Sequence, residues 1–453
     1  MKKNIPWILA GVVVSLAAWN APLARADVKL PKVIDSHMVL QQETPLPIWG
    51  WAAPGEQVSV QLDDRAPVKA KADEQGNWKV VLPAVKADAK THQLAVSGTN
   101  KIQLEDILIG EVWLGSGQSN MEMSLGSTQK AKEAIAAANC PQIRLFQVPK
   151  VQSGAPAKDV NATWNACTPQ TAGGFSAALY YFGKRIQQEV NVRVGLINSS
   201  WGGSPIEPWF AGPGKSGGMY NGMIAPIAPF ALRGLLWYQG ESNAFGKNGM
   251  KYFDKSKELI EGWRRVWGLD LPFYLVQIAP FSGYPAGELP ALWEAQVATL
   301  KIPATGMAVI TDLVDNIRDI HPQNKLDVGN RLALWALAKN YGKKDLVYSG
   351  PLYKSMKVEG DKVRLSFAHV AGGLVSRDGK PLTEFQIAGA DGKFVAAEAT
   401  IDGATVVVQA KDVAAPTQVR FGWTHTANPN LSNKEGLPAS PFRTENWQGG
   451  TGE

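Results

Sequence analysis

The sequence predicts an α/β protein in which a parallel sheet is flanked on both sides along the chain by β-rich segments. Three observations indicate this. Short strand-like runs separated by turn clusters fill residues 27–105, apolar runs alternate with helical patterns over residues 106–345, and strand-like runs return over residues 346–453. Alternation of strands and helices is typical of a parallel sheet covered on both faces. We take these three ranges as the predicted domains.

The first 26 residues predict a secretory signal peptide, which is not part of the fold. Lys2 and Lys3 precede a mostly apolar stretch, Trp7 to Ala18, that is too short to span a bilayer. Ala24-Arg25-Ala26 is a typical A-x-A cleavage site. No later segment has the length of a transmembrane helix, so we expect a soluble, secreted, periplasmic protein that starts at Asp27 and is free of the membrane after cleavage.

The two outer segments predict small β-sandwich-type domains. Their strand-like runs are short, and turn signals such as Ala53-Pro54-Gly55, Asp378-Gly379 and Asp391-Gly392 punctuate them. The runs in the first segment are 45–51, 58–62, 78–82 and 92–96, and those in the last are 363–367, 405–409 and 418–423.

The middle segment predicts the parallel sheet and its helices. Apolar runs, expected as strands, lie at 108–114, 143–148, 192–197, 233–238, 272–278 and 307–311. Helical patterns lie at Phe175–Glu189, Tyr252–Trp267, Ala291–Leu300 and Lys325–Tyr341. Ligands of such folds bind outside the carboxyl ends of the strands, so the loops that follow the strands are where a site is expected.

Charge and cysteine content exclude some partners. Removing residues 1–26, which hold Lys2, Lys3 and Arg25 and no acidic residue, lowers the formal net charge from +6 to +3. Without a cluster of basic residues, this mild charge gives no sign of nucleic-acid binding. Neither cysteine has a Cys or His at metal-ligand spacing, so we expect no metal and no cofactor. In an oxidising compartment Cys140 and Cys167 predict a disulfide, with two free thiols as the alternative.

The first loop of the middle segment presents a serine. Gly117-Gln118-Ser119-Asn120-Met121 follows the apolar run Ile109–Leu114 and precedes a helix-compatible stretch. A strand-to-helix turn of this kind places a serine Oγ beside free backbone N–H groups, which suits a nucleophile. The alternative is a polar turn in which Ser119 caps the helix.

Two further loops contain groups that could bind a developing negative charge. Gly202 and Gly203 follow the run at 192–197, and glycines let the backbone approach a substrate with its N–H groups. Asn243 follows the run at 233–238 and offers an amide donor. Ordinary turn chemistry is the alternative for both loops.

The fourth loop supplies a base. Of the five histidines, only His321 lies within residues 106–345, and Asp319 precedes it by two positions. Acyl transfer by serine needs a base of near-neutral pKa and a group that orients the imidazole, so Ser119, Asp319 and His321 make up a possible triad. The alternative is a surface histidine before a helix start, with an acid favoured near the helix N-terminus.

These four loops together resemble the sialate O-acetylesterases of the SGNH hydrolase superfamily. The resemblance rests on Gly117–Met121, Trp201-Gly202-Gly203, Trp237–Asn243 and Asp319–Pro322 in order along the chain. It extends over nearly the whole mature chain, through the flanking stretches Val39–Gln42, Pro47–Gly50 and Gly436–Phe442.

The resemblance implies a flavodoxin-like three-layer domain that hydrolyses acetyl esters on sugars without a metal. Ser119 would be the nucleophile and His321 the base. The oxyanion hole would consist of the N–H groups of Ser119 and of Gly202 or Gly203, together with Asn243. Four residues of the same loops are predicted to contact the substrate: Gln118, Trp201, Gln239 and Glu241.

One position departs from the family pattern. SGNH enzymes often have the acid three residues before the histidine, and Arg318 stands there in this chain. The nearest acid is Asp319, so the orienting role falls to its carboxylate, to its backbone carbonyl, or to Asp312 or Asp315.

The sequence therefore predicts a carbohydrate O-acetylesterase that acts on O-acetylated sialic acids through an acetyl-serine intermediate. An acetyl-xylan or other polysaccharide deacetylase with the same machinery is the alternative among enzymes. A non-catalytic glycan-binding protein, which would hold sugar with some of its 16 tryptophans, is the alternative of another class. The oligomeric state stays open.

Overall fold

The computed structural model describes residues 1, 3, 27–212, 214 and 216–452. The predicted signal peptide, apart from residues 1 and 3, lies outside the described residues. Among the helices that the structure describes, none combines the length and apolarity needed to cross a bilayer.

The centre of the molecule is a parallel sheet. Its strands, in spatial order, are β13 (Thr305–Val309), β12 (Phe273–Gln277), β11 (Gly234–Tyr238), β7 (Lys101–Gly117), β10 (Val194–Ser200) and β8 (Cys140–Gln147), with β9 (Trp164–Cys167) antiparallel at the edge. Every residue of β10, β11, β12 and β13 is buried, as expected for strands covered on both faces. This confirms the predicted α/β architecture.

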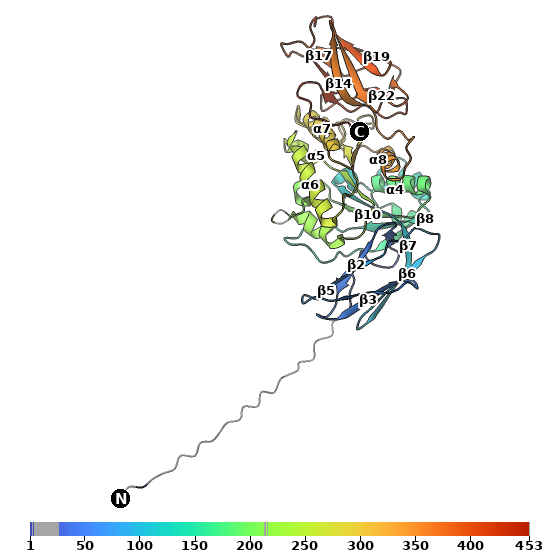
Figure 1. Ribbon diagram of the computed structural model, residues 1–453. Helices are drawn as coiled ribbons and strands as arrows, with labels where there is room; N and C mark the ends of the chain where they lie inside the picture. The colour runs from blue at the N-terminus through green and yellow to red at the C-terminus, as the bar shows by residue number, and fades with distance from the viewer. Residues whose placement is uncertain (2, 4–26, 213, 215, 453) are drawn as a thin grey trace.

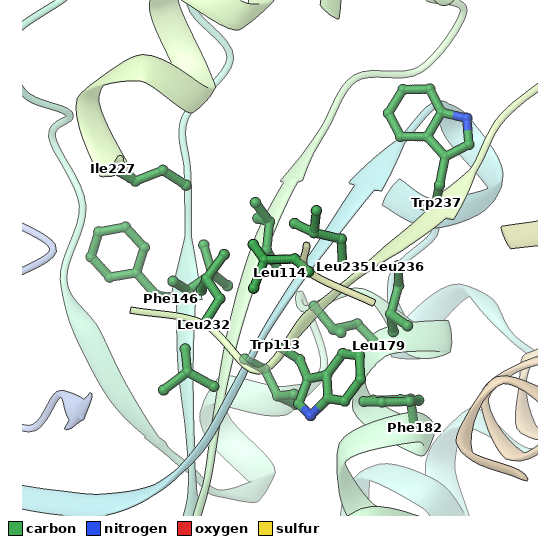
Figure 2. Packing of buried hydrophobic residues seen from close by; sticks show 14 of the residues in the cluster. Trp113, Leu114, Phe146, Leu179, Phe182, Ile227, Leu232, Leu235, Leu236 and Trp237 are labelled. Carbon is green, nitrogen blue, oxygen red and sulfur yellow. The ribbon is translucent and has the colours of Figure 1, made fainter. Parts of the chain in front are cut away.

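Helices cover the two faces of the sheet. In Figure 1, α6 (Lys251–Trp267) and α7 (Glu288–Ala298) lie on the left of the strands, and α4 (Ala177–Val190) and α8 (Lys325–Asn340) lie on the right. Figure 2 shows Trp113 of β7 beside Phe182 of α4, and the ring centroids are 4.9 Å apart. Trp237 of β11 instead packs on Trp263 of α6, with centroids 6.0 Å apart. The result is a three-layer sandwich.

The short α-helices among the described residues are α1 (Ser119–Glu122), α2 (Ala131–Ala136), α3 (Pro169–Ala172) and α5 (Glu241–Phe245).

The N-terminal strands share a strand with the central sheet. The first half of β7 pairs antiparallel with β6 (His92–Ser97), and its second half pairs with β10 and β11. The predicted border between residues 105 and 106 therefore lies inside one continuous strand. The remaining strands here are β1 (Val39–Gln41), parallel to β7; β3 (Gln57–Leu62) and β4 (Val68–Lys71), in the β6 sheet; and the pair β2 (Leu46–Trp51) and β5 (Asn77–Leu82).

The C-terminal strands enclose a hydrophobic core of their own, which includes Val363, Ile387 and Phe421. One sheet consists of β14 (Leu352–Glu359), β15 (Lys362–Ala368), β20 (Thr405–Gln409) and β19 (Glu398–Asp402). A second consists of β18 (Val395–Ala396), β17 (Phe385–Ala388), β21 (Gln418–Phe421) and β23 (Phe442–Arg443), and β16 (Leu374–Ser376) pairs with β22 (Leu431–Asn433). Arg443 joins this segment to α7 through an ion pair of 2.8 Å with the buried Glu294.

The predicted disulfide is absent from the structure, in which Cys140 and Cys167 are free thiols. The two residues do lie directly opposite each other in the pairing of β8 with β9. Burial raises the pKa of Cys167 to about 12.

Candidate active site

The backbone at the end of β7 fixes the position of Ser119. Gly117 has φ +136°, and a Cβ at this residue would lie 2.1 Å from the carbonyl oxygen of Tyr238 on the neighbouring strand. Only glycine fits there. The N–H of Gln118 donates to that same carbonyl at 3.0 Å, and Ser119 follows as the first residue of α1. Ser119 thus stands at the carboxyl end of a central strand.

His321 lies next to this serine. Its Nε2 is 2.9 Å from Ser119 Oγ, across more than 200 residues of sequence. The imidazole is partly exposed, at 38% for the side chain. Burial lowers the pKa of His321 below its usual value, and the nearby charge of Lys325 adds to this, while Asp319 opposes it. A histidine that stays neutral near pH 7 can accept the serine proton.

Asp319 is the acid beside His321. Its Oδ1 accepts the backbone N–H of His321 at 2.9 Å and lies 3.6 Å from Nδ1 of the ring. The backbone bends at Ile320 and His321, which lets the carboxylate of Asp319 fold back toward the imidazole. Asp312, one of the other candidates, accepts hydrogen bonds from Nη1 and Nη2 of Arg331, both at 2.6 Å. Asp315 is exposed on the same loop.

A cavity of about 640 Å³ opens over the serine and the histidine. Glu122, on the same short helix as Ser119, projects its carboxylate into this space. Its Oε2 accepts the N–H of Gly202 at 2.5 Å, and its Oε1 pairs with Lys150 Nζ at 2.5 Å. The lining consists of Ser119, Glu122, Met123, Ser124, Ser127, Gln147, Lys150, Gly174, Asn198, Gly202, Asp319, His321 and Gln323.

The two predicted glycines lie on the loop that borders the serine. A Cβ on Gly202 would be 3.4 Å from the Cβ of Ser119, so the backbone of this loop lies next to Ser119. Gly203 follows with φ +74°, and its carbonyl accepts the hydroxyl of Ser242 at 3.0 Å. The N–H of Gly202 therefore points at Glu122.

Asn243 has surroundings that differ from those predicted. Its side chain is buried, its Nδ2 donates to both carboxylate oxygens of Glu207 at 3.2 Å, and its Oδ1 accepts the N–H of Ile206 at 3.0 Å. It does not line the cavity around Ser119. The predicted donor to the oxyanion is therefore engaged in joining α5 to the 204–207 loop.

Three of the four predicted substrate contacts are also buried beneath the cavity. Gln239 Nε2 donates to Gln118 Oε1 at 3.0 Å and to Asn243 Oδ1 at 2.8 Å, and Glu241 Oε1 accepts from Asn120 at 2.6 Å. Buried polar groups need partners, and most of these side-chain atoms have one in a neighbouring loop, although Glu241 Oε2 has none among the described residues. Gln118, Gln239 and Glu241 thus support the loops and do not line the cavity. Trp201 is partly exposed, and its N–H donates to the carbonyl of Gly117 at 3.0 Å.

Several residues that sequence reasoning missed belong to the site. Glu122 and Lys150 line the cavity, and Asn120 and Lys325 bind the loop that carries His321. The sequence could have indicated Glu122, because it lies three residues after Ser119 and therefore about one turn along α1, on the same side of the helix. Lys150 offered no such signal, because it follows β8 in a segment without regular structure.

Comparisons with known proteins identify the family. The model of the family described as carbohydrate esterase, sialic acid-specific acetylesterase, matches residues 109–338. The sialate O-acetylesterase of Homo sapiens is 31% identical over 426 residues, which cover 80% of this chain and 81% of that protein. The chain belongs to the sialic acid-specific acetylesterase family. The sialate O-acetylesterase of Mus musculus is 30% identical over 440 residues, which cover 78% of this chain and 81% of that protein.

A solved structure agrees with membership of this acetylesterase family. The crystal structure of a carbohydrate acetylesterase from Xanthomonas citri has a TM-score of 0.87 and 42% sequence identity, and the match covers 93% of this chain and all of that one. The chain is therefore an enzyme, a carbohydrate O-acetylesterase, and the non-catalytic alternative is set aside. All ten predicted site residues fall inside the range matched by the family model.

Proposed function

We propose that this acetylesterase removes acetyl groups from O-acetylated sialic acids through an acetyl-Ser119 intermediate. The observation that carries the mechanism is the 2.9 Å contact between Ser119 Oγ and His321 Nε2 at the floor of the cavity. Ser119 Oγ attacks the ester carbonyl carbon as His321 accepts its proton. The tetrahedral intermediate collapses, and the proton passes to the leaving sugar oxygen. Water, deprotonated by His321, then releases acetate and restores Ser119.

The proposed oxyanion donors are the N–H groups of Ser119 and Gly202. The N–H of Ser119 is the first of α1 and has no acceptor within the helix. The N–H of Gly202 already donates to a negatively charged oxygen, that of Glu122, at 2.5 Å. We infer that the carbonyl oxygen of the ester displaces Glu122 from this donor when the reaction begins.

Replacing Glu122 by glutamine is expected to raise kcat/KM for a small acetyl ester. A neutral amide oxygen is a weaker acceptor than a carboxylate, so it competes less for the N–H of Gly202. The measurement is hydrolysis of p-nitrophenyl acetate, with Glu133→Gln on an exposed face of α2 as the matched control. A lower kcat/KM in the folded Glu122→Gln variant would instead make Glu122 a support of the Gly202 loop.

Replacing Asn243 by alanine is expected to lower stability more than turnover. The change leaves the buried amide of Gln239 and the buried N–H of Ile206 without this partner, and a buried polar group left unpaired costs about 1–3 kcal/mol. Thermal unfolding and kcat measured on the same preparation check this. A hundredfold loss of kcat at an unchanged Tm would contradict the structural role and return Asn243 to the oxyanion hole.

Acetate release tests the proposed substrate. Wild-type enzyme and Ser119→Ala are incubated with O-acetylated sialic acid, acetyl-xylan, acetylated peptidoglycan and acetylated pectin at matched ester concentrations. We expect the highest kcat/KM on O-acetylated sialic acid, with the activity lost in Ser119→Ala. A preference for acetyl-xylan or another polysaccharide would overturn the substrate while leaving the serine mechanism in place.

We also propose that the enzyme is exported to the periplasm. The supporting observation is the charged, apolar and A-x-A pattern of residues 1–26. Cell fractionation and N-terminal sequencing of the mature protein test this. A first residue of Asp27 in the periplasmic fraction is expected, and an uncleaved chain in the cytoplasm would refute it.

A further inference from the structure

A cluster of buried polar side chains lies beneath the loop that carries His321. It consists of Asn120, Glu241 and Lys325, whose exposed fractions are 1%, 1% and 0%. They come from three distant parts of the chain: α1, α5 and the start of α8. None of them lines the cavity around Ser119, and the proposed reaction does not use them.

Lys325 and Asn120 hold the two backbone carbonyls that flank His321. Lys325 Nζ donates to the carbonyl of Pro322 at 2.6 Å, on the C-terminal side of the histidine. Asn120 Nδ2 donates to the carbonyl of Ile320 at 3.0 Å, on the N-terminal side. With one residue on each side fixed, the backbone of His321 has little freedom to rotate or translate.

The same side chains are joined to one another. Lys325 Nζ donates to Asn120 Oδ1 at 2.7 Å, and Asn120 Nδ2 donates to Glu241 Oε1 at 2.6 Å. The amide of Asn120 therefore links the buried side chain of Lys325 to the buried side chain of Glu241. The ammonium also lies over the ring of Tyr238, 5.3 Å from its centroid, which suits a cation.

Lys325 stands where a lysine is unfavourable. It is the first residue of α8, so its positive charge faces the positive end of the helix dipole. Its complete burial adds a desolvation cost, and this burial lowers the pKa of Lys325 to about 7. A residue that breaks two local rules at an enzyme site is expected to serve the function of that site.

We propose that Lys325 is a positioning residue for His321: together with Asn120 it clamps the carbonyls on both sides of the base, and Glu241 balances its charge. This rests on the proposed role of His321 as the base. The clamp keeps Nε2 at hydrogen-bond distance from Ser119, and a displacement of about 1 Å costs on the order of a hundredfold in rate.

The clamp also affects the charge state of His321. The ionisable groups that act on the imidazole are Lys325 from α8 and Asp319 from the same loop, and the hydroxyl of Ser119 faces its Nε2. Burial is the largest cause of the lowered pKa of His321, and the charge of Lys325 lowers this pKa further. Removing that charge should therefore raise the pKa of His321 and move the acidic limb of kcat/KM to higher pH.

The test uses the paired variant Glu241→Gln/Lys325→Met, which removes both buried charges at once. We expect kcat for p-nitrophenyl acetate to fall roughly a hundredfold with KM little changed, and the acidic limb of kcat/KM to move to higher pH. Lys339→Met is the matched control, because Lys339 lies on the same helix over the ring of Tyr348, at 4.6 Å. It should leave both readouts unchanged.

Lys325→Gln is the second variant, needed if the paired variant fails to fold. Glutamine keeps a donor for the carbonyl of Pro322 but no charge, so we expect a smaller loss of kcat with the acidic limb still displaced. A folded variant with the wild-type kcat and pH profile would overturn the positioning role. Ser119→Ala separates the two proposals: if it stays active, the proposed mechanism fails, whereas the Lys325 variants test the clamp alone.

Discussion

Replacing Ser119 or His321 by alanine is expected to lower kcat by several orders of magnitude with the fold intact. The two side chains are in contact at 2.9 Å and act as one nucleophile–base unit, so the double variant should lose little more than either single one. Both residues are partly exposed to the cavity, and truncating them leaves no buried group without a partner. Acetate release and p-nitrophenyl acetate hydrolysis measure the effect.

Ser124→Ala is the matched control for this experiment. Ser124 lines the same cavity, and its hydroxyl contacts only Ser127, at 2.9 Å, among the hydrogen bonds of its side chain within the described residues. It should keep nearly the wild-type kcat. Wild-type turnover in a pure, folded Ser119→Ala protein would rule out the serine mechanism altogether.

Replacing Asp319 by asparagine is expected to cut kcat by about 10⁴, as in the serine-protease triad, where the wrong imidazole tautomer is favoured. The contact of 3.6 Å between Asp319 Oδ1 and His321 Nδ1 is longer than a hydrogen bond, and a positive imidazolium would draw the carboxylate closer. Steady-state kinetics at matched stability measure this.

Asp312→Asn is the control for the orienting acid. Asp312 forms an ion pair with Arg331, and asparagine removes its charge from this pair. The substitution should therefore lower the Tm while kcat stays close to that of the wild type. A nearly normal kcat in Asp319→Asn would show that the carboxylate is dispensable and that the backbone orients the imidazole.

The strands, the main helices and the proximity of Ser119 to His321 could be predicted from sequence because they depend on local patterns. Runs such as 192–197 and 233–238 are apolar on both faces, and in a parallel sheet the loops after them meet at one edge. Ser119 and His321 follow from that rule and from the scarcity of histidine. The roles of the other polar residues in these loops could not be predicted, because a loop has no periodicity that shows which side chains face the cavity.

Asn243 and Glu241 illustrate the difference. Both lie on α5, directly after β11, where a catalytic amide or acid would also be expected. The structure shows that they turn inward and bind Glu207 and Asn120. Their partners come from other loops, so their environment depends on tertiary contacts that no single stretch of sequence encodes. The same holds for Lys325, which in the sequence is only the start of a helix.

The continuity of β7 has a consequence for how the protein unfolds. Ser119 follows a strand whose first residues belong to the N-terminal sheet, and the buried residues of both sheets form one core. Separating the N-terminal strands would require breaking the strand that ends at the nucleophile. We therefore expect the N-terminal and central sheets to unfold as one cooperative unit, with loss of the first strands inactivating the enzyme. The C-terminal segment has a core of its own, and opening it would break the ion pair between Arg443 and the buried Glu294.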